Sequence, residues 1–124
     1  MKLQGIFAQS LNDLSAYCHQ ANAKWWIDID TGLFKPQNVG EKFMLIVSEI
    51  AEAMEGERKN LMDDHLPHRK MVEVVLADAL IRIFDYAGAY GMDLGGALVE
   101  KLAYNKIRAD HSTAARLGVN GKRF

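Results

Sequence analysis

Two glutamates at a three-residue spacing are the first candidates for chemistry in this sequence. Glu49 and Glu52 lie in the segment SEIAEAMEGE, and on a helix their carboxylates project from one face, within roughly 60° of each other. Two carboxylates held side by side repel each other unless a cation lies between them. The pair predicts either a metal site or a solvated acidic face that forms salt bridges with Lys42 or Arg58.

A third acid lies in a later apolar segment. Asp78 interrupts VVLADALIRIF, and Arg82 and Asp85 follow it at four and seven residues, which places all three on one face of a helix. One interpretation is a surface ladder of alternating charges. The other is that Asp78 joins Glu49 and Glu52 across a helix–helix interface, where the three bind a hard divalent cation through oxygen ligands.

A polar stripe near the C-terminus is suited to anions. Lys101, Asn105 and Arg108 follow one another at spacings of four and three, so two cations and an amide donor share one helix face. Such a face suits phosphate oxygens, because Lys supplies a point charge and Arg a forked donor. Lys and Arg near a helix C-terminus also complement the helix dipole, and both interpretations stay open.

Adjacent tryptophans begin a segment without periodicity. Trp25 and Trp26 head the stretch WWIDIDTGLFKPQNVG, which reads as a long loop of a length that is often functional. The two side chains either cover one end of a helical core or offer an aromatic face to a nucleobase.

Four helices are expected to position these residues, because apolar side chains recur at three- and four-residue spacing in four segments. Asn38 with Glu41 forms a capping pattern, Pro67 suits a first helical turn, and Asp93 is a natural N-cap. No strand pairing is expected, and residues 110–124 are expected to be an extended tail. The predicted helices span about Ile6 to Ala23, Asn38 to Arg58, His68 to Tyr90 and Leu94 to Ala109.

Composition indicates one globular domain covering residues 1–124. Hydrophobic residues make up 49% and charged residues 25% of the 124, which is enough apolar material for a core. The net charge of -1 gives no general attraction to nucleic acid polymers or to anionic membranes. Cys18, the one cysteine, rules out an intrachain disulfide. Without a signal-peptide pattern or a long apolar run, a cytoplasmic location is expected.

Metal and nucleotide sites of several common kinds are not indicated. The four histidines have no spacing typical of zinc ligands. The segment GMDLGG lacks the ending of a phosphate-binding loop and follows no predicted strand.

The order of these features resembles one family. A Trp-bearing loop, a helix with Glu-x-x-Glu, a helix with an embedded Asp, a Gly-Met-Asp-Leu turn and a helix with Lys-x-x-x-Asn-x-x-Arg are similar to the all-alpha, MazG-like nucleoside triphosphate pyrophosphohydrolases. That group includes the dimeric dUTPases and the dCTP pyrophosphatases, and the chain looks especially like its short phage and mobile-element members. The resemblance covers most of residues 24–124 and rests on KWWIDIDTG, LIVSEIAEAMEGERK, VLADALIRIFDYAGAYGMDLGGALVEKLAYNKIRADH and GKRF.

The resemblance implies a function and a set of site residues. A four-helix MazG-like fold and hydrolysis of a nucleoside triphosphate to a monophosphate and pyrophosphate are expected, with magnesium, or manganese in its place, as cofactor. The metal ligands and catalytic carboxylates are expected to be Glu49, Glu52 and Asp78. Glu52 is expected to orient or deprotonate the attacking water, and the triphosphate and base to contact Lys101, Asn105, Arg108, Trp25 and Trp26.

One position departs from the family pattern. Val75 stands where the residue three before Asp78 should be a carboxylate. Glu73, the nearest acid, is about 140° away around the helix. Loss of one carboxylate weakens the binding of a hard cation, so the alternative function is a nucleotide-binding or structural homologue that is impaired in catalysis.

Self-association is expected as well. The third predicted helix is apolar over much of its length, and members of the family are dimers or tetramers with sites near subunit contacts, so a homodimer or homotetramer is predicted. The identity of the nucleotide does not follow from these residues.

Overall fold

The computed structural model of the chain describes residues 2–108 and 117–121. Within these ranges it contains four α-helices, one short 3₁₀ helix and no strand beyond two isolated β-bridges. The prediction of an all-α chain with four helices is confirmed. The elements are α1 (Leu3–Ala21), η1 (Ala23–Trp25), α2 (Val39–Arg58), α3 (Met71–Ala89) and α4 (Leu94–Ile107).

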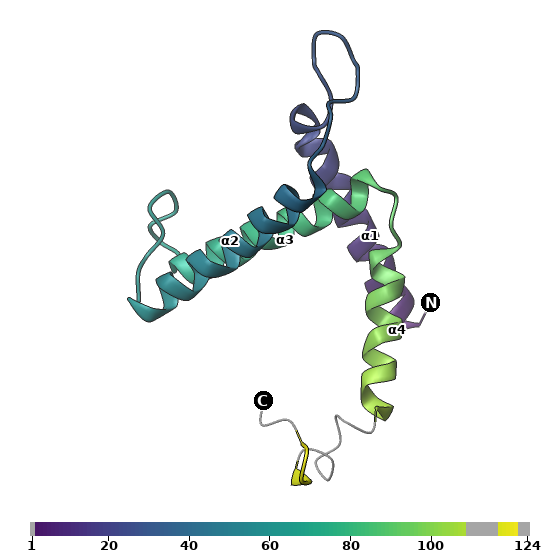
Figure 1. Cartoon of the computed structure of the whole chain (residues 1–124), viewed down its shortest axis with the longest axis vertical. Coiled ribbons are helices and arrows are strands. Elements are labelled where there is room, and N and C mark those ends of the chain that lie inside the picture. The colour runs from purple at the N-terminus through teal and green to yellow at the C-terminus, as the bar shows by residue number, and fades with distance from the viewer. Residues whose placement is uncertain (1, 109–116, 122–124) are drawn as a thin grey trace.

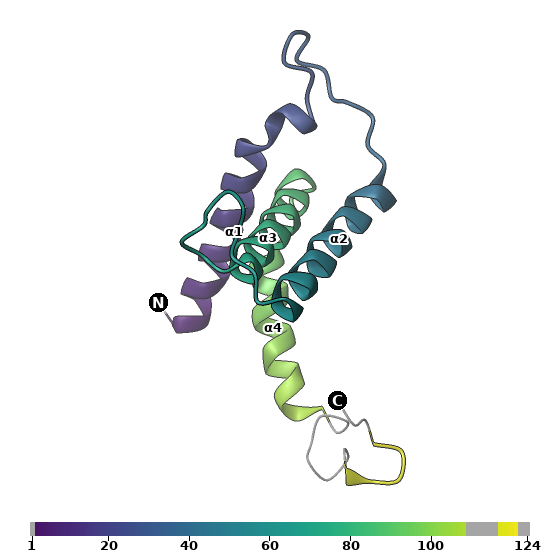
Figure 2. The same cartoon turned by 90° about the vertical axis from the view of Figure 1, so that its left-hand side faces the viewer.

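The third helix lies at the centre of the fold. α3 packs against both α1 and α2, and α4 packs against α1. Figure 2 shows α1 and α2 on opposite sides of α3, with the segment between η1 and α2 projecting beyond them. In Figure 1 the α2–α3 pair extends to one side while α4 descends beside α1, so α4 points away from that pair.

Close helix contacts depend on small residues. A side chain at Gly88 of α3 would overlap the carbonyl oxygen of Ser15, and one at Gly95 of α4 would overlap that of Ala8. Both glycines therefore let a neighbouring helix approach α1 backbone to backbone. The buried hydrophobic residues among those described are Cys18, Trp26, Ala53, Val75, Ala79, Phe84 and Ala87.

Two predicted helix caps are confirmed. Asn38 Oδ1 accepts a hydrogen bond from the backbone N–H of Glu41 at 3.0 Å, and Asp93 Oδ1 accepts one from the N–H of Gly96 at 2.8 Å. Each satisfies a donor that the first helical turn leaves without an intrahelical partner.

The other boundaries differ from the prediction by a few residues. α1 begins three residues earlier than predicted, at Leu3. α3 begins three residues later, at Met71, because Met62 and Lys70 pair in an antiparallel bridge that holds Pro67 in a turn. Ala109, the predicted end of α4, lies outside the described residues.

The predicted tail is described only in part. Of residues 110–124, the structure describes 117–121, which contain a turn closed by a hydrogen bond from Gly121 N–H to the carbonyl oxygen of Gly118 at 3.1 Å. The rest of that prediction lies outside the described residues. Among the helices that are described, none combines the length and the apolar character that crossing a membrane requires.

Candidate functional site

A cleft of about 650 Å³ lies between α2, α3 and the segment that precedes α2. Along α2 its lining runs from Asn38 through Lys42 to Glu49, and α3 contributes Asp78, Arg82 and other residues. The volume lies within the range of small-molecule sites, which span roughly 300–1,000 Å³. Acidic, basic, amide and aromatic side chains all reach this one cleft.

The structure brings two of the three predicted metal ligands to the cleft. Glu49 and Asp78 both line it, from α2 and α3. Burial, and after it the negative charge of Glu49, raise the pKa of Asp78, whereas the charge of Arg82 lowers it. The two carboxylates are therefore close enough to repel each other, as the sequence predicts for a pair that faces a cation.

Glu49 already has a cationic partner from the opposite helix. Its side chain is 12% exposed, and Arg82 Nε donates a hydrogen bond to its Oε1 at 3.1 Å. In the described part of the chain, Arg82 forms no ion pair with Asp78 or Asp85. The surface ladder is therefore not formed, and Arg82 instead connects α3 to α2.

Glu52 does not join this lining. It lies three residues beyond Glu49 on α2, where its side chain is exposed, and it is not among the cleft residues. Across the described residues, no three His, Cys, Asp or Glu side chains form a group that could hold a metal ion by themselves. Any cation in the cleft would therefore need ligands from another source, such as water or a bound substrate.

Val75 lies in the core. Its exposed fraction is 4%, and it does not line the cleft. A carboxylate at this position would lose most of its hydration, at a large cost unless it found a cation or a hydrogen-bond donor. Glu73, at the start of α3, is exposed.

The two tryptophans have different roles in the structure. Trp26 is 1% exposed, and its Nε1 donates hydrogen bonds to both carboxylate oxygens of Asp85, at 2.9 and 3.0 Å. His19 Nδ1 lies 2.9 Å from the same Asp85 Oδ1, and the Lys42 ammonium lies 3.9 Å from the centre of the Trp26 ring. Trp26 thus covers the core, and Asp85, which lines the cleft, holds it in place.

Trp25 is the tryptophan that remains open to a ligand. It is 61% exposed and lines the cleft. Gln37 Nε2 donates to its carbonyl oxygen at 3.2 Å, so the end of η1 is connected to the segment before α2. Of the two interpretations drawn from the adjacent tryptophans, the core position belongs to Trp26, and Trp25 provides the accessible aromatic face.

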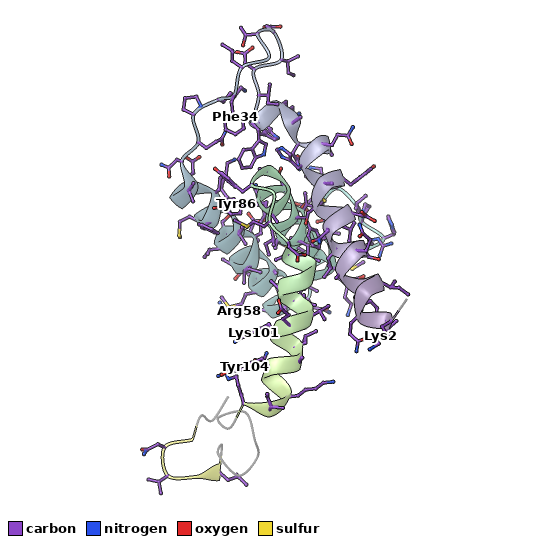
Figure 3. All side chains as sticks on the ribbon, turned by 90° about the vertical axis from the view of Figure 1, so that its right-hand side faces the viewer. Lys2, Phe34, Arg58, Tyr86, Lys101 and Tyr104 are labelled. Atoms are coloured by element: carbon purple, nitrogen blue, oxygen red, sulfur yellow. The ribbon has the colours of Figure 1, made fainter. Side chains whose placement is uncertain are left out.

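The predicted phosphate-binding stripe lies away from the cleft. Lys101, Asn105 and Arg108 belong to α4 and its C-cap, and none of the three lines the cleft. The cationic groups of Lys101 and Arg108 lie 4.9 and 6.0 Å from the centre of the Tyr104 ring, so both lie beside the same aromatic side chain. Figure 3 shows Lys101 and Tyr104 far along the long axis from Phe34, the ring that contacts Trp26.

Several residues of the cleft were missed by the reasoning from sequence. Asn22, Gln37 and Lys42 contribute to the lining, and the charge of Asp63 adds to the rise in the pKa of Asp78. The capping pattern at Asn38 marked the start of α2, but no local signal showed that the preceding segment folds back over α3. That placement depends on Trp26 and Asp85, which are 59 residues apart in the chain.

Comparisons of the chain with known protein families, with curated proteins and with solved structures find no match.

Proposed function

We propose that the protein is a nucleoside triphosphate pyrophosphohydrolase whose active site is built on the α2–α3 cleft. The observation that carries the proposal is that Glu49 and Asp78, from two different helices, line one cleft together with Arg82 and the exposed Trp25. Carboxylates suit a divalent cation, a guanidinium suits phosphate and an indole face suits a base. The resemblance to MazG-like enzymes, drawn from the sequence, agrees with this combination.

The residues of the cleft fit a magnesium ion that arrives with its substrate. Two carboxylates, Glu49 and Asp78, line the cleft, and magnesium is commonly bound through one or two carboxylates together with substrate phosphates and water. When bound, the ion would supply Lewis-acid polarisation of the phosphate oxygens. Manganese, which also prefers oxygen ligands, is expected to replace it.

The chain's own residues are assigned separate tasks. Trp25 stacks on the base, and Lys42 and Arg82 attract the phosphates into the cleft. A water oxygen attacks the α-phosphorus, the bond from that phosphorus to the bridging oxygen breaks, and pyrophosphate leaves with the electron pair. A glutamate of α2 is proposed to accept the proton of the water. Glu49 lines the cleft, whereas Glu52, one turn beyond it, does not, so Glu52 can serve as the base only if its side chain turns into the cleft. Replacement of Glu52 by Gln should then slow pyrophosphate release, and an unchanged rate would remove this role.

A second copy of the chain is proposed to complete the site. Val47, Ile50 and Met54 follow each other at spacings of three and four on α2 and remain half exposed, as does Leu80 on α3. Such a stripe is typical of helix–helix association. None of Lys101, Asn105 and Arg108 lines the cleft of its own chain, and α4 extends away from the α2–α3 pair (Figure 1). We therefore propose that these three residues serve phosphates in a homodimer or homotetramer.

An unsatisfied polar atom on α4 supports the proposed second subunit. Asn105 Oδ1 is buried and has no hydrogen-bond partner within the described residues. Buried polar atoms are nearly always satisfied in folded proteins. A donor from a second subunit or from a phosphate-bound water would satisfy it. Sedimentation as a species of 13.9 kDa would contradict the proposed oligomer.

A second candidate function is nucleotide binding without turnover. The observation that favours it is Val75, which is buried where the family pattern expects a carboxylate. Valine in place of a carboxylate at this position takes away about one unit of negative charge, which lowers the affinity for a hard cation.

Product analysis separates these two functions. The protein is incubated with magnesium or manganese and a panel of ordinary and modified nucleoside triphosphates, and pyrophosphate and monophosphate are assayed, with Val75→Glu alongside. Release of both products by the natural protein supports the enzyme. Release by Val75→Glu alone would indicate an intact nucleotide site that has lost catalysis, and nucleotide binding by neither protein would refute both functions.

A further inference from the structure

The end of the cleft beside Trp25 is lined by three amide side chains, Asn22, Gln37 and Asn38. An amide presents an acceptor on one side and donors on the other, so its direction decides which ligand edges it can read. In each of these three side chains one end is engaged by the backbone. The engaged end fixes which atom, nitrogen or oxygen, is left at the other end.

Two of the amides have their nitrogen engaged. Asn22 Nδ2 donates to the carbonyl oxygen of Cys18 at 3.0 Å, and Gln37 Nε2 donates to the carbonyl oxygens of Trp25 and Lys35 at 3.2 and 3.0 Å. A carbonyl oxygen only accepts hydrogen bonds, so the nitrogen must be the atom that faces it. Asn22 Oδ1 and Gln37 Oε1 are left as acceptors, with no hydrogen-bond donor among the residues that the structure describes.

The third amide has the opposite direction. Asn38 Oδ1 accepts from the backbone N–H of Glu41 at 3.0 Å, and a backbone N–H only donates, so the oxygen must face the helix. Asn38 Nδ2 is therefore left as a donor, and it has no acceptor within residues 2–108 and 117–121. The amide end of the cleft thus offers two acceptors and one donor beside an exposed aromatic ring.

We propose that the cleft selects nucleotides whose base carries an exocyclic amino group beside an unprotonated ring nitrogen, as cytosine and adenine do, and disfavours uracil and thymine. The amino group donates to Asn22 Oδ1 and Gln37 Oε1, and the ring nitrogen accepts from Asn38 Nδ2. Uracil and thymine present a keto oxygen and an N–H at these two places, so acceptor meets acceptor and donor meets donor. This inference rests on the proposed function for the presence of a nucleotide in the cleft.

Trp25 connects the amides to the base plane. Its backbone N–H donates to the carbonyl oxygen of Asn22 at 3.0 Å, and its own carbonyl oxygen accepts from Gln37. The backbone of Trp25 is therefore hydrogen-bonded to the backbone of Asn22 and to the side chain of Gln37. Stacking is tolerant of base identity, so Trp25 contributes affinity and the amides contribute the choice of base.

Binding of paired nucleotides tests the inference. The α,β-methylene analogues of CTP and UTP, which resist cleavage at the α–β bond, are titrated into the natural protein with magnesium, by calorimetry. The cytidine compound is expected to bind at least about fivefold more tightly, since one well-matched base edge discriminates by about 1–3 kcal/mol. Equal binding would overturn the base preference and leave the proposed function standing, whereas binding of neither analogue would overturn both.

A variant at Asn38 makes the test specific. Asn38→Asp keeps an oxygen that caps α2 but replaces the donor nitrogen by an acceptor, so the cytidine-to-uridine affinity ratio is expected to fall toward one. Asn38→Ser keeps the cap without added charge and is expected to lower the ratio too. Gln4→Glu, which adds the same charge at the exposed start of α1, should leave the ratio unchanged. An unaltered ratio in Asn38→Asp would overturn the assignment.

Discussion

Arg82 of α3 and Glu49 of α2 form an ion pair across the floor of the cleft, with Arg82 Nε 3.1 Å from Glu49 Oε1. The guanidinium holds the carboxylate that the proposed function needs for magnesium. On the proposed function, Arg82 and magnesium would compete for one carboxylate, and Arg82 would be released to contact a phosphate when a triphosphate and its metal enter together.

Replacing Arg82 by Gln should strengthen magnesium binding to the free protein. Removal of a partly exposed ion pair frees Glu49 by about 0.2–1 kcal/mol, which corresponds to an affinity increase of up to about fivefold. Calorimetric titration with magnesium measures the change, and Arg58→Gln, at an exposed pair with Glu55 on the same helix, is the control. Weaker binding in Arg82→Gln than in the control would show that Glu49 is not a ligand.

Asp85→Asn should destabilise the fold without a change of side-chain size. Asp85 accepts from Trp26 through both oxygens and lies within hydrogen-bond distance of His19, and an amide cannot accept on both sides. A loss of about 1–3 kcal/mol in the free energy of unfolding is expected, because a buried donor is left without its acceptor. Urea unfolding at fixed protein concentration measures this. Asp64→Asn, at an exposed position, serves as the comparison, and similar midpoints for both variants would contradict the expectation.

Asp78→Asn should stabilise the metal-free protein at neutral pH and not in acid. Burial and the charge of Glu49 raise the pKa of Asp78 above its ordinary value of 3.8, so in the pH range just above 3.8 the folded state binds more protons than the unfolded state. Stability therefore falls as pH rises through that range. The amide has no such penalty. Its advantage at pH 7 should stay below about 1 kcal/mol because the side chain is partly solvated.

The pH dependence of unfolding in the presence of a chelator provides the check. The free energies of unfolding of the natural protein and of Asp78→Asn should be most similar near pH 3. At pH 7 the variant should have the larger free energy of unfolding. A variant that is less stable than the natural protein at pH 7 and equal to it at pH 3 would show that the carboxylate is stabilised, not destabilised, by its surroundings.

Gly95→Ala should loosen α4 from α1. An added methyl group would overlap the carbonyl oxygen of Ala8, and forced repacking of this kind costs about 1–3 kcal/mol. That exceeds the gain of up to about 1 kcal/mol in helix propensity. Gly40→Ala, whose nearest contact would be Asn38 Oδ1 at 3.4 Å, should be tolerated. Thermal unfolding of Gly95→Ala and Gly40→Ala measures the difference. Equal melting temperatures of the two variants would contradict the close packing of α1 and α4.

Local signals in the sequence predicted the helices well. The side chains of Asn38 and Asp93 each accept a hydrogen bond from the backbone N–H three residues later. Both partners of each bond are therefore close together in the sequence, where the capping pattern can be recognised. The start of α3 was misplaced because it depends on pairing between Met62 and Lys70, and Pro67 alone, which suits a first turn, does not reveal that pairing.

The candidate site was predicted in its chemistry more than in its arrangement. One of the two interpretations of the sequence placed Glu49, Glu52 and Asp78 together across two helices; Glu49 and Asp78 line the cleft, and Glu52 does not. The sequence did not show that Trp26 is buried and Trp25 exposed. That difference depends on Asp85, the hydrogen-bond partner of Trp26, which lies 59 residues further along the chain. The packing of α4 against α1 could not be predicted from the sequence either, because the contact between Gly95 and Ala8 joins two residues that are far apart in the chain.

Magnesium-dependent release of pyrophosphate by three matched proteins tests the proposed function most directly. Natural protein, Glu49→Gln and Glu57→Gln, the last at an exposed position on α2, are compared at equal concentration with a cytidine triphosphate substrate. We expect equimolar pyrophosphate and monophosphate from the natural protein and from Glu57→Gln. We expect a rate at least about a hundredfold lower from Glu49→Gln, in line with the loss of a group that stabilises the transition state. Equal rates in all three proteins, or release of orthophosphate instead of pyrophosphate, would contradict it.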